Sequence, residues 1–424
     1  MLIDVGVTGG EFAVRLPGQP RAVHSYEDSH DDTGSNPSSQ RWIGDIIEAR
    51  FSRRAGLQGL VGAAGLLSIA GEQSRRVETT TSLTFEEVPR KSDQGIRVAP
   101  GYRAQVLLRW GDKVLPDAPP FDPYRQTAAA QAKQFGYNCD FVAYMPLPFG
   151  SQNGGHGLLC VNHEYTSTHL MFPRTGLGAL TEQEQVNIEL AAHGHSVVEI
   201  KWVGGVDGRW DVVYGGYNRR ITPLDTEIRL SGPAAGHPRL RTRADPTGTR
   251  VIGTLNNCGG GITPWGTLLI AEENFHQYFS GNPAGTAEAQ NYKRYGFRDA
   301  PTCRDWCTYH ERFTIEQEPH EPNRFGWAVE YDPYDPESIP VKRTALGRFK
   351  REAATTAVNE DGRVVVYSGD DEQFEYVYKF VSERPYDPAD RSANRDLLDE
   401  GTLYVAKFED DGTMRWLPLV FGQS

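Results

Sequence analysis

The chain has 424 residues, a formal net charge of -12, 45 glycines and 27 prolines. This length can supply the core of one large all-β domain or of two ordinary domains. The acidic balance argues against nucleic acid or an anionic membrane surface as the main partner. Acidic clusters do recruit calcium. Five cysteines without a CxxC pair leave at least one thiol unpaired and give no zinc spacing.

The N-terminal segments read as a leader and an export signal. Residues 1–50 are polar and lack apolar periodicity, which predicts a disordered leader. Residues 51–75 place Arg53 and Arg54 before a glycine- and leucine-rich run that is too short for a membrane span. This pattern indicates a twin-arginine signal, with an amphipathic helix as the alternative. We therefore expect the twin-arginine machinery to export the protein to the periplasm or beyond, without stable membrane insertion.

Short apolar or alternating runs, separated by turn residues, follow in chain order. Strands are predicted at residues 100–112, 138–146, 158–165, 197–203, 209–214, 250–254, 267–271, 327–332, 363–367, 376–381, 402–408 and 414–417. The runs at 197–203 and 209–214 should form a hairpin, and those at 376–381 and 402–408 should pair. Helices are predicted at 128–135 and at 179–194, the second with a capping box between Thr181 and Glu184.

Many short strands favour an all-β fold, either a propeller or a sandwich. Their spacing is too irregular for a repeat such as WD40. We expect residues 76–424 to form a β-propeller with long loops and a few short helices, because inner strands would then point their ends at a central channel.

Polar side chains follow several predicted strands at the point where each strand ends. They are residues 162–164, 272–274, Glu352 and 370–372. Adjacent carboxylates repel each other unless a cation, an arginine or solvent lies between them. Their recurrence favours a shared metal site over a set of solvated strand ends. Carboxylates and amides suit calcium or manganese, whereas thiolate and imidazole suit iron or zinc, so a mixed site fits this set.

Other site types have little support in the sequence. The chain contains no Walker A loop, no GxGxxG after a strand and no GxSxG elbow. Arginines near the acidic groups could bind phosphate oxygens in pairs of hydrogen bonds. These arginines are Arg219, Arg220, Arg343, Arg348 and Arg351.

At these positions the sequence resembles the PhoX-type bacterial alkaline phosphatases. The matching motifs are residues 157–166, 254–267, 272–275, 342–349 and 369–372. The similarity covers nearly the whole chain. It implies a β-propeller, hydrolysis of phosphomonoesters outside the cytoplasm, and an iron–calcium cluster held by carboxylates and a cysteine thiolate.

Residue roles follow from the same resemblance. The predicted metal ligands are Cys160, Glu164, Glu272, Glu273, Glu352, Asp370 and Asp371. Cys139 is the second choice for the thiolate, and Cys258, in a glycine-rich turn, could be structural. Arg348 is expected to bind phosphate, and Asn162 is expected to line the channel and take part in catalysis.

One departure from the family concerns length. PhoX-type chains are usually much longer than this one, which stops at Ser424 directly after a predicted strand. The expectation is therefore a propeller that is incomplete at its C-terminus, with unpaired strand edges. We expect a monomeric, exported phosphomonoesterase. The alternatives are a calcium-bound propeller lactonase or phosphotriesterase, and a non-catalytic, calcium-stabilised binding propeller.

Overall fold

The computed structural model describes residues 86, 88–89, 95–172, 180–297 and 306–422. The predicted leader (1–50) and export signal (51–75) lie outside these residues. The described chain divides into two compact units: residues 108–407 with 416–422, and residues 86–107 with 408–415. The strand predicted at 100–112 is wrong. Residues 102–109 have no regular structure, and most of their side chains are exposed.

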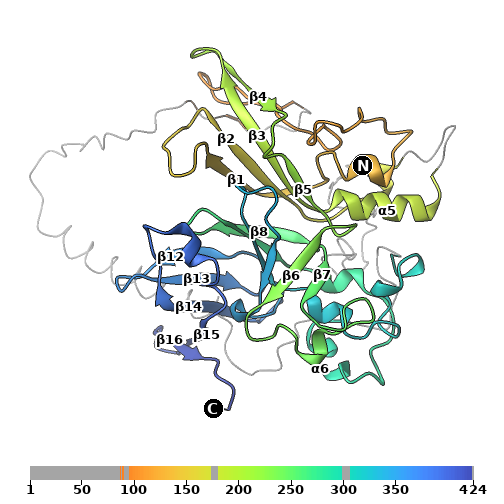
Figure 1. Cartoon of the computed structure of the whole chain (residues 1–424), viewed down its shortest axis with the longest axis vertical. Helices are drawn as coiled ribbons and strands as arrows, with labels where there is room; N and C mark the ends of the chain where they lie inside the picture. Colours follow the sequence, from red (N-terminus) through yellow and green to blue (C-terminus); the bar gives the residue numbers. More distant parts are fainter. Residues whose placement is uncertain (1–85, 87, 90–94, 173–179, 298–305, 423–424) are drawn as a thin grey trace, which may run out of the picture. The chain divides into compact units, whose positions relative to one another are not determined.

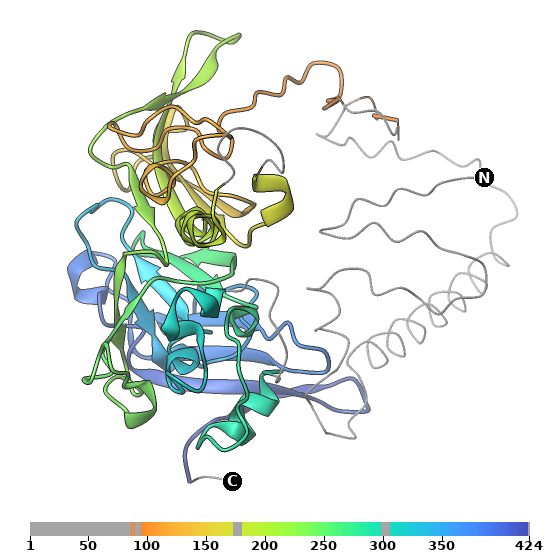
Figure 2. The ribbon, with the colours of Figure 1, turned by 90° about the vertical axis from the view of Figure 1, so that its right-hand side faces the viewer.

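Three β-sheets carry the larger unit, and they follow one another in chain order (Figures 1 and 2). The first sheet has the order β1-β2-β3-β4, with β5 also paired to β3. Its strands are β1 (Cys139–Pro146), β2 (His156–His163), β3 (Gly194–Val203), β4 (Arg209–Val213) and β5 (Arg219–Ile221). Residues 197–203 and 209–213 form the predicted hairpin, with Trp202 opposite Trp210.

The second sheet has the order β7-β6-β11-β10-β9-β8, in which β6 and β11 run parallel. Its strands are β6 (Glu227–Ser231), β7 (Arg250–Ile252), β8 (Asn257–Ile262), β9 (Leu268–Glu272), β10 (Ala328–Tyr331) and β11 (Val341–Arg343). The third sheet has the order β12-β13-β14-β15-β16, and β14 pairs with β15 as predicted. Its strands are β12 (Thr355–Val358), β13 (Arg363–Gly369), β14 (Val377–Pro385), β15 (Gly401–Phe408) and β16 (Met414–Pro418).

Helices are few and short among the described residues. They are α3 (Ala128–Gln131), α4 (Thr168–Met171), α5 (Glu182–Ala192), α6 (Ala289–Arg294) and the 3-10 turns η1 (Pro238–Leu240), η2 (Phe275–Tyr278), η3 (Trp306–Thr308), η4 (Glu311–Phe313), η5 (Glu321–Arg324), η6 (Thr344–Leu346) and η7 (Arg391–Asn394). The predicted capping box of α5 is present, with the Thr181 amide donating to Glu184 at 2.8 Å. The helix predicted at 128–135 is shorter, because residues 133–135 hydrogen-bond to residues 112–115 instead.

Strands β9, β10 and β11 of the second sheet are buried on both faces, and β9 shows why. Leu268 and Ile270 belong to the main core, whereas Leu269 belongs to a second core with Val366 and Phe380 of the third sheet. Successive side chains of a strand point to opposite faces, so β9 separates the two cores. The prediction of a mostly β fold with few helices is confirmed in this form.

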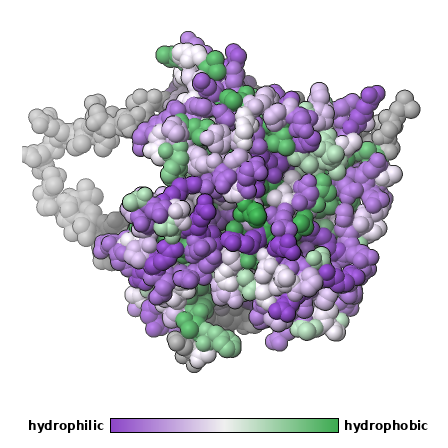
Figure 3. All heavy atoms as spheres, in the orientation of Figure 1, coloured by the Kyte–Doolittle hydropathy of each residue, from purple (hydrophilic) through white to green (hydrophobic). Residues whose placement is uncertain are grey.

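The exposed surface is mainly polar. On the face shown in Figure 3, hydrophobic residues appear in small separate groups among hydrophilic ones. Within the described residues, no helix combines the length and the apolar character that crossing a bilayer requires.

Candidate metal centre

Cys258 lies in β8 at an irregularity in the sheet. Asn257 pairs with Glu272 and Gly260 pairs with Ile270, so two residues of β8 face one residue of β9 between these pairs. This is a β-bulge, a feature that turns a side chain away from the regular alternation. The Cys258 side chain is 6% exposed.

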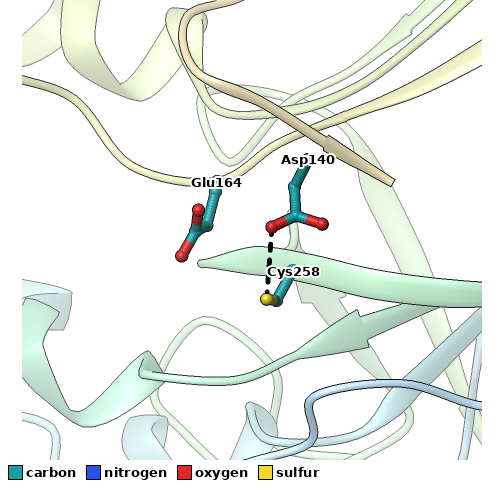
Figure 4. Close-up of side chains that lie close together, drawn as sticks. All are labelled: Asp140, Glu164 and Cys258. Carbon is teal, nitrogen blue, oxygen red and sulfur yellow. Dashed lines mark hydrogen bonds between the residues drawn. The ribbon is translucent and has the colours of Figure 1, made fainter. Parts of the chain in front are cut away.

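Two groups of possible metal ligands share the Cys258 sulfur. One contains Asp140 and Glu164, and the other contains Glu273 and Glu352; the ligand atoms within each group lie within 4.8 Å of one another. The Cys258 thiol is 3.3 Å from an Asp140 oxygen and 3.3 Å from a Glu352 oxygen. Figure 4 shows Asp140, Glu164 and Cys258 pointing toward one another. Five side chains therefore converge around one sulfur.

The five side chains come from all three sheets. Asp140 lies in β1, Glu164 directly follows β2, and Glu273 directly follows β9. Glu352 precedes β12, and its amide donates to the Gly369 carbonyl at 3.3 Å. Residues 351–352 thus lie beside residues 369–370, and Arg351 pairs with Asp370 in an isolated β-bridge. Strand ends thus bring together acids that are far apart in sequence.

Glycines after Cys258 allow this approach. A Cβ at Gly259 would lie 2.3 Å from the Glu352 carbonyl oxygen, and one at Gly261 would lie 1.9 Å from the Ala354 carbonyl oxygen. No side chain fits at such distances. The glycine run therefore lets β8 lie directly against residues 352–354, which places Glu352 beside Cys258.

The electrostatics of these side chains favour a cation among them. Burial raises the pKa of the Cys258 thiol, and the neighbouring carboxylates, Glu273 first, raise it further. Burial also raises the pKa of Glu273 well above its usual range, with Asp371 as the next cause. Burial and Asp371 raise the pKa of Glu352 as well. Acids that repel each other in this way favour a bound cation, and a donor set of one thiol with several carboxylates fits a metal cluster.

Glu272 and Glu273 are adjacent but have different surroundings. Glu272 is fully buried, and one of its carboxylate oxygens accepts from Lys342 Nζ at 2.7 Å. The other oxygen accepts from the amides of Gly326 and Trp327 at 3.0 and 3.1 Å. Because Glu272 shares the face of Leu268 and Ile270, it points toward the main core. Glu273 alone of the pair joins the candidate centre.

Cys160 is placed elsewhere. Its side chain is completely buried in β2, where it hydrogen-bonds to Tyr331 and burial raises the pKa of its thiol to about 12. Asn162, two residues later, donates its amide to backbone carbonyls of Cys258 and Gly259 at 2.5 and 3.0 Å. The structure therefore places Asn162 behind Cys258, in contact with its backbone.

Arg348 is held by backbone and aromatic groups. Its guanidinium donates to the carbonyls of Phe325 and Pro322 at 2.7 and 2.8 Å, and it stacks on the rings of Phe275 and Tyr295. These contacts occupy Nε and one terminal nitrogen of the side chain. Within the described residues, the groups that the Arg348 guanidinium contacts belong to the protein's own backbone and aromatic side chains.

Asp370 and Asp371 face different surroundings. Asp371 lies next to Glu273 and Glu352 and contributes to the raised pKa of each. Asp370 lines a small cavity in which Lys350 pairs with Glu372, and burial raises the pKa of Asp370 to about 7. The complete lining of this cavity is Arg294, Tyr295, Lys350, Asp370, Glu372 and Glu375. A polar cavity thus adjoins the candidate centre.

Sequence reasoning missed two members of the centre. Asp140 follows Cys139 at the start of a predicted strand. Cys258 is assigned from the sequence to a glycine-rich turn in which it could be structural, but it lies in strand β8. The signal for Cys258 was the run of three glycines after it, since a purely structural cysteine needs no such close backbone approach. For Asp140, the position at a strand entry gives only a weak signal.

The raised pKa of Glu273 predicts how stability changes with pH in the metal-free protein. At about pH 6.5 to 8 an unfolded glutamate has released its proton. Folded Glu273, because its pKa is raised, retains more of that proton, so the folded state binds more protons through this group. Stability should therefore fall as pH rises, by at most about 1.4 kcal/mol per pH unit for this proton. The buried histidines His163 and His195 have lowered pKa values and are neutral when folded, whereas the unfolded chain still binds protons on them near pH 6.5. Their contribution has the opposite sign and is the same in a variant that changes only Glu273. Urea unfolding of chelator-treated protein at both pH values measures the slope.

A matched control is Glu273→Gln, which removes the titrating group with little change in shape. Its unfolding free energy should depend less on pH than that of the wild type over the same window. A variant whose stability depends on pH as strongly as that of the wild type, or falls more steeply as pH rises, would contradict the assignment.

Two comparisons with known proteins found a match. The sequence profile of the family "Alkaline phosphatase PhoX" matches residues 83–424. A solved structure, Pseudomonas fluorescens PhoX in complex with vanadate, a transition state analogue, is 41% identical with a TM-score of 0.73. The match covers 80% of this chain and 59% of that one, so this chain spans about three fifths of the solved relative's length. No curated protein matches the chain. The chain therefore belongs to the PhoX alkaline phosphatase family.

Proposed function

We propose that the protein is a metal-dependent phosphomonoesterase. The observation that carries this proposal is the convergence of one thiol and four carboxylates. The raised pKa values of Cys258, Glu273 and Glu352 favour a cation between these groups. Membership of the PhoX family and the vanadate bound to the solved relative support the reaction class. The substrates we propose are small phosphomonoesters.

The chemistry of the side chains favours a cluster of iron and calcium. Thiolate is a soft ligand that suits iron, whereas carboxylates are hard ligands that suit calcium. We propose Asp140, Glu164, Cys258, Glu273 and Glu352 as ligands, with Asp371 beside them. When bound, such cations act as Lewis acids toward a phosphoryl oxygen. The thiol argues against a site of calcium alone, as the lactonase alternative would need.

The protein's own groups would handle protons when the centre fills. Cys258 must lose its proton to become a ligand, and Asp140 and Glu352 lie at 3.3 Å to accept a hydrogen bond from it. Glu273 must also release the proton that its raised pKa holds. Metal binding should therefore release protons and be weaker at low pH. Asp371 lies within hydrogen-bonding reach of both Glu273 and Glu352 and can accept a proton from either.

The test is hydrolysis of p-nitrophenyl phosphate by the purified chain after loading with iron and calcium. We expect release of p-nitrophenol, and EDTA should lower the rate to that of a blank without enzyme. Phosphodiesters and lactones serve as comparison substrates. No hydrolysis of the monoester by metal-loaded protein would refute the proposal, and turnover of a diester or lactone alone would favour the alternative function.

We further propose that the three sheets are blades of a β-propeller, and that the protein is exported as a monomer to the periplasm or beyond. Support for the propeller is that successive sheets carry the acids at their strand ends. Support for export is the Arg53–Arg54 pair, which lies outside the described residues. Loss of export after exchange of both arginines for lysine, measured by cell fractionation, tests the second point.

A further inference from the structure

A buried amide spans the first and second sheets behind the candidate centre. Asn162 in β2 is completely buried, and its Nδ2 donates to the carbonyls of Cys258 and Gly259. These two carbonyls belong to the bulge of β8, where the pairing with β9 is interrupted. The Asn162 side chain therefore supplies hydrogen bonds where the backbone pairing between β8 and β9 is interrupted.

The orientation of this amide is fixed by a histidine. Because Nδ2 of Asn162 is the donor to two carbonyls, its Oδ1 must be the acceptor of the contact with His195 Nδ1, at 2.7 Å. His195 is completely buried, and burial lowers its pKa well below the usual range. The neutral ring then carries its proton on Nδ1, and Nε2 is left as an acceptor.

The donor to His195 Nε2 is Tyr331, whose hydroxyl forms a short hydrogen bond with it. Tyr331 has one proton to give, so its contact with Cys160 must use the thiol as donor. The direction of every bond follows: Cys160 to Tyr331, Tyr331 to His195, His195 to Asn162, and Asn162 to the backbone of the bulge. All four side chains are buried, and unsatisfied groups at such depth are costly.

We propose that Asn162 and His195 are positioning residues that hold the bulge so that the Cys258 thiol points into the centre. As a statement about a metal site this rests on the proposed function, but the geometry can be tested without it. Residues that orient a ligand typically change metal affinity by about 10- to 100-fold when replaced. The amide direction matters most, because an oxygen in place of Nδ2 would face two carbonyl oxygens.

The first experiment measures the rate at which iodoacetamide alkylates each thiol of the metal-free chain, followed by peptide mass spectrometry. Cys307, a free thiol in η3 outside this hydrogen-bond chain, serves as an internal measure of general opening. Asn162→Asp is nearly isosteric but cannot donate to the bulge carbonyls when ionised. His195→Leu removes the donor to Asn162, whereas His195→Asn keeps an N–H donor near the position of Nδ1.

We expect Asn162→Asp and His195→Leu to raise the ratio of the Cys258 rate to the Cys307 rate by about tenfold, in line with the effect of lost orienting groups. His195→Asn should remain close to the wild type. A ratio that is unchanged in all variants would overturn the proposal, as would equal increases at both thiols, which indicate general destabilisation. If Asn162→Asp does not fold, the two His195 variants decide.

The second experiment titrates the same variants with iron and follows the sulfur-to-metal charge-transfer absorption. Affinity should weaken about 10- to 100-fold in His195→Leu and much less in His195→Asn. Equal affinity in both would refute a positioning role. Neither experiment measures phosphatase turnover. A wild-type chain that fails to hydrolyse the ester would therefore refute the proposed function, whereas the alkylation rates would still test the positioning role of Asn162 and His195.

Discussion

Replacing Cys258 by serine is expected to abolish the sulfur-to-metal absorption of the iron-loaded protein and to lower phosphatase activity by at least about 100-fold. Groups that merely orient a ligand change affinity by about 10- to 100-fold, so loss of the shared ligand should cost at least as much. The sulfur belongs to both groups of candidate ligands, so its loss affects the whole centre. Metal analysis after gel filtration, together with the rate of p-nitrophenyl phosphate hydrolysis, measures the effect.

Cys307 offers a matched control, since it is a free thiol in η3, outside both groups of candidate ligands. Cys307→Ser should keep its metal and its activity. Cys160→Ser provides the competing test, because the sequence favours Cys160 as the thiolate. Iron retained by Cys258→Ser but lost by Cys160→Ser would reverse the assignment.

Replacing Lys342 by methionine is expected to lower the free energy of unfolding by about 3–5 kcal/mol, the usual cost of leaving one partner of a buried ion pair uncompensated. Lys342 and Glu272 are both fully buried, and Lys342 Nζ also donates to the Arg324 carbonyl at 2.9 Å. Methionine has a similar length and no charge, so the change mainly removes the partner of Glu272. Denaturant unfolding at neutral pH measures the loss.

A double variant separates the lost partner from lost packing. In Lys342→Met with Glu272→Gln no buried charge is left unpaired, and the glutamine oxygen can still accept backbone amides. We expect it to recover more than half of the stability lost by the single variant. A single variant that loses less than about 1 kcal/mol would show that the pair is weaker than buried pairs usually are.

Local patterns predicted most strands, with ends that differ from the observed ones by up to four residues, but not β6, β8, β11 or β12. Glu164, Glu273 and Glu352 could be proposed as ligands because each stands next to a strand end, and the structure brings each of them to Cys258. The capping box of α5 and the β3–β4 hairpin were also readable, because both depend on residues that are close in sequence.

Other assignments depended on which face a side chain occupies. Glu272 and Glu273 look alike in the sequence, but only the core composition on each side of β9 decides which one faces the centre. The face on which Cys160 lies is equally hard to predict, because a strand buried on both faces shows no alternation of apolar and polar residues. For Arg348, the deciding contacts are backbone carbonyls of η5 and its end, which no local pattern reveals.

Local sequence patterns could not predict the order of strands in the second sheet either. β11 inserts between β6 and β10 and runs parallel to β6. This crossover brings Lys342 beneath Glu272, 70 positions earlier in the chain. Long-range pairings of this kind depend on tertiary packing and not on residue spacing.

The spread of the ligand groups along the chain has a kinetic meaning. The proposed ligands Asp140 and Glu352 are 212 positions apart (352 − 140), and the set from Asp140 to Glu352 lies in or near strands of three separate sheets. An ion held by all of them would act as a cross-link that closes very long loops of the unfolded chain. No sheet could then detach without breaking coordination bonds first. Metal loading should therefore lengthen the lifetime of the folded protein by slowing its unfolding rate, so that its durability is kinetic as well as thermodynamic.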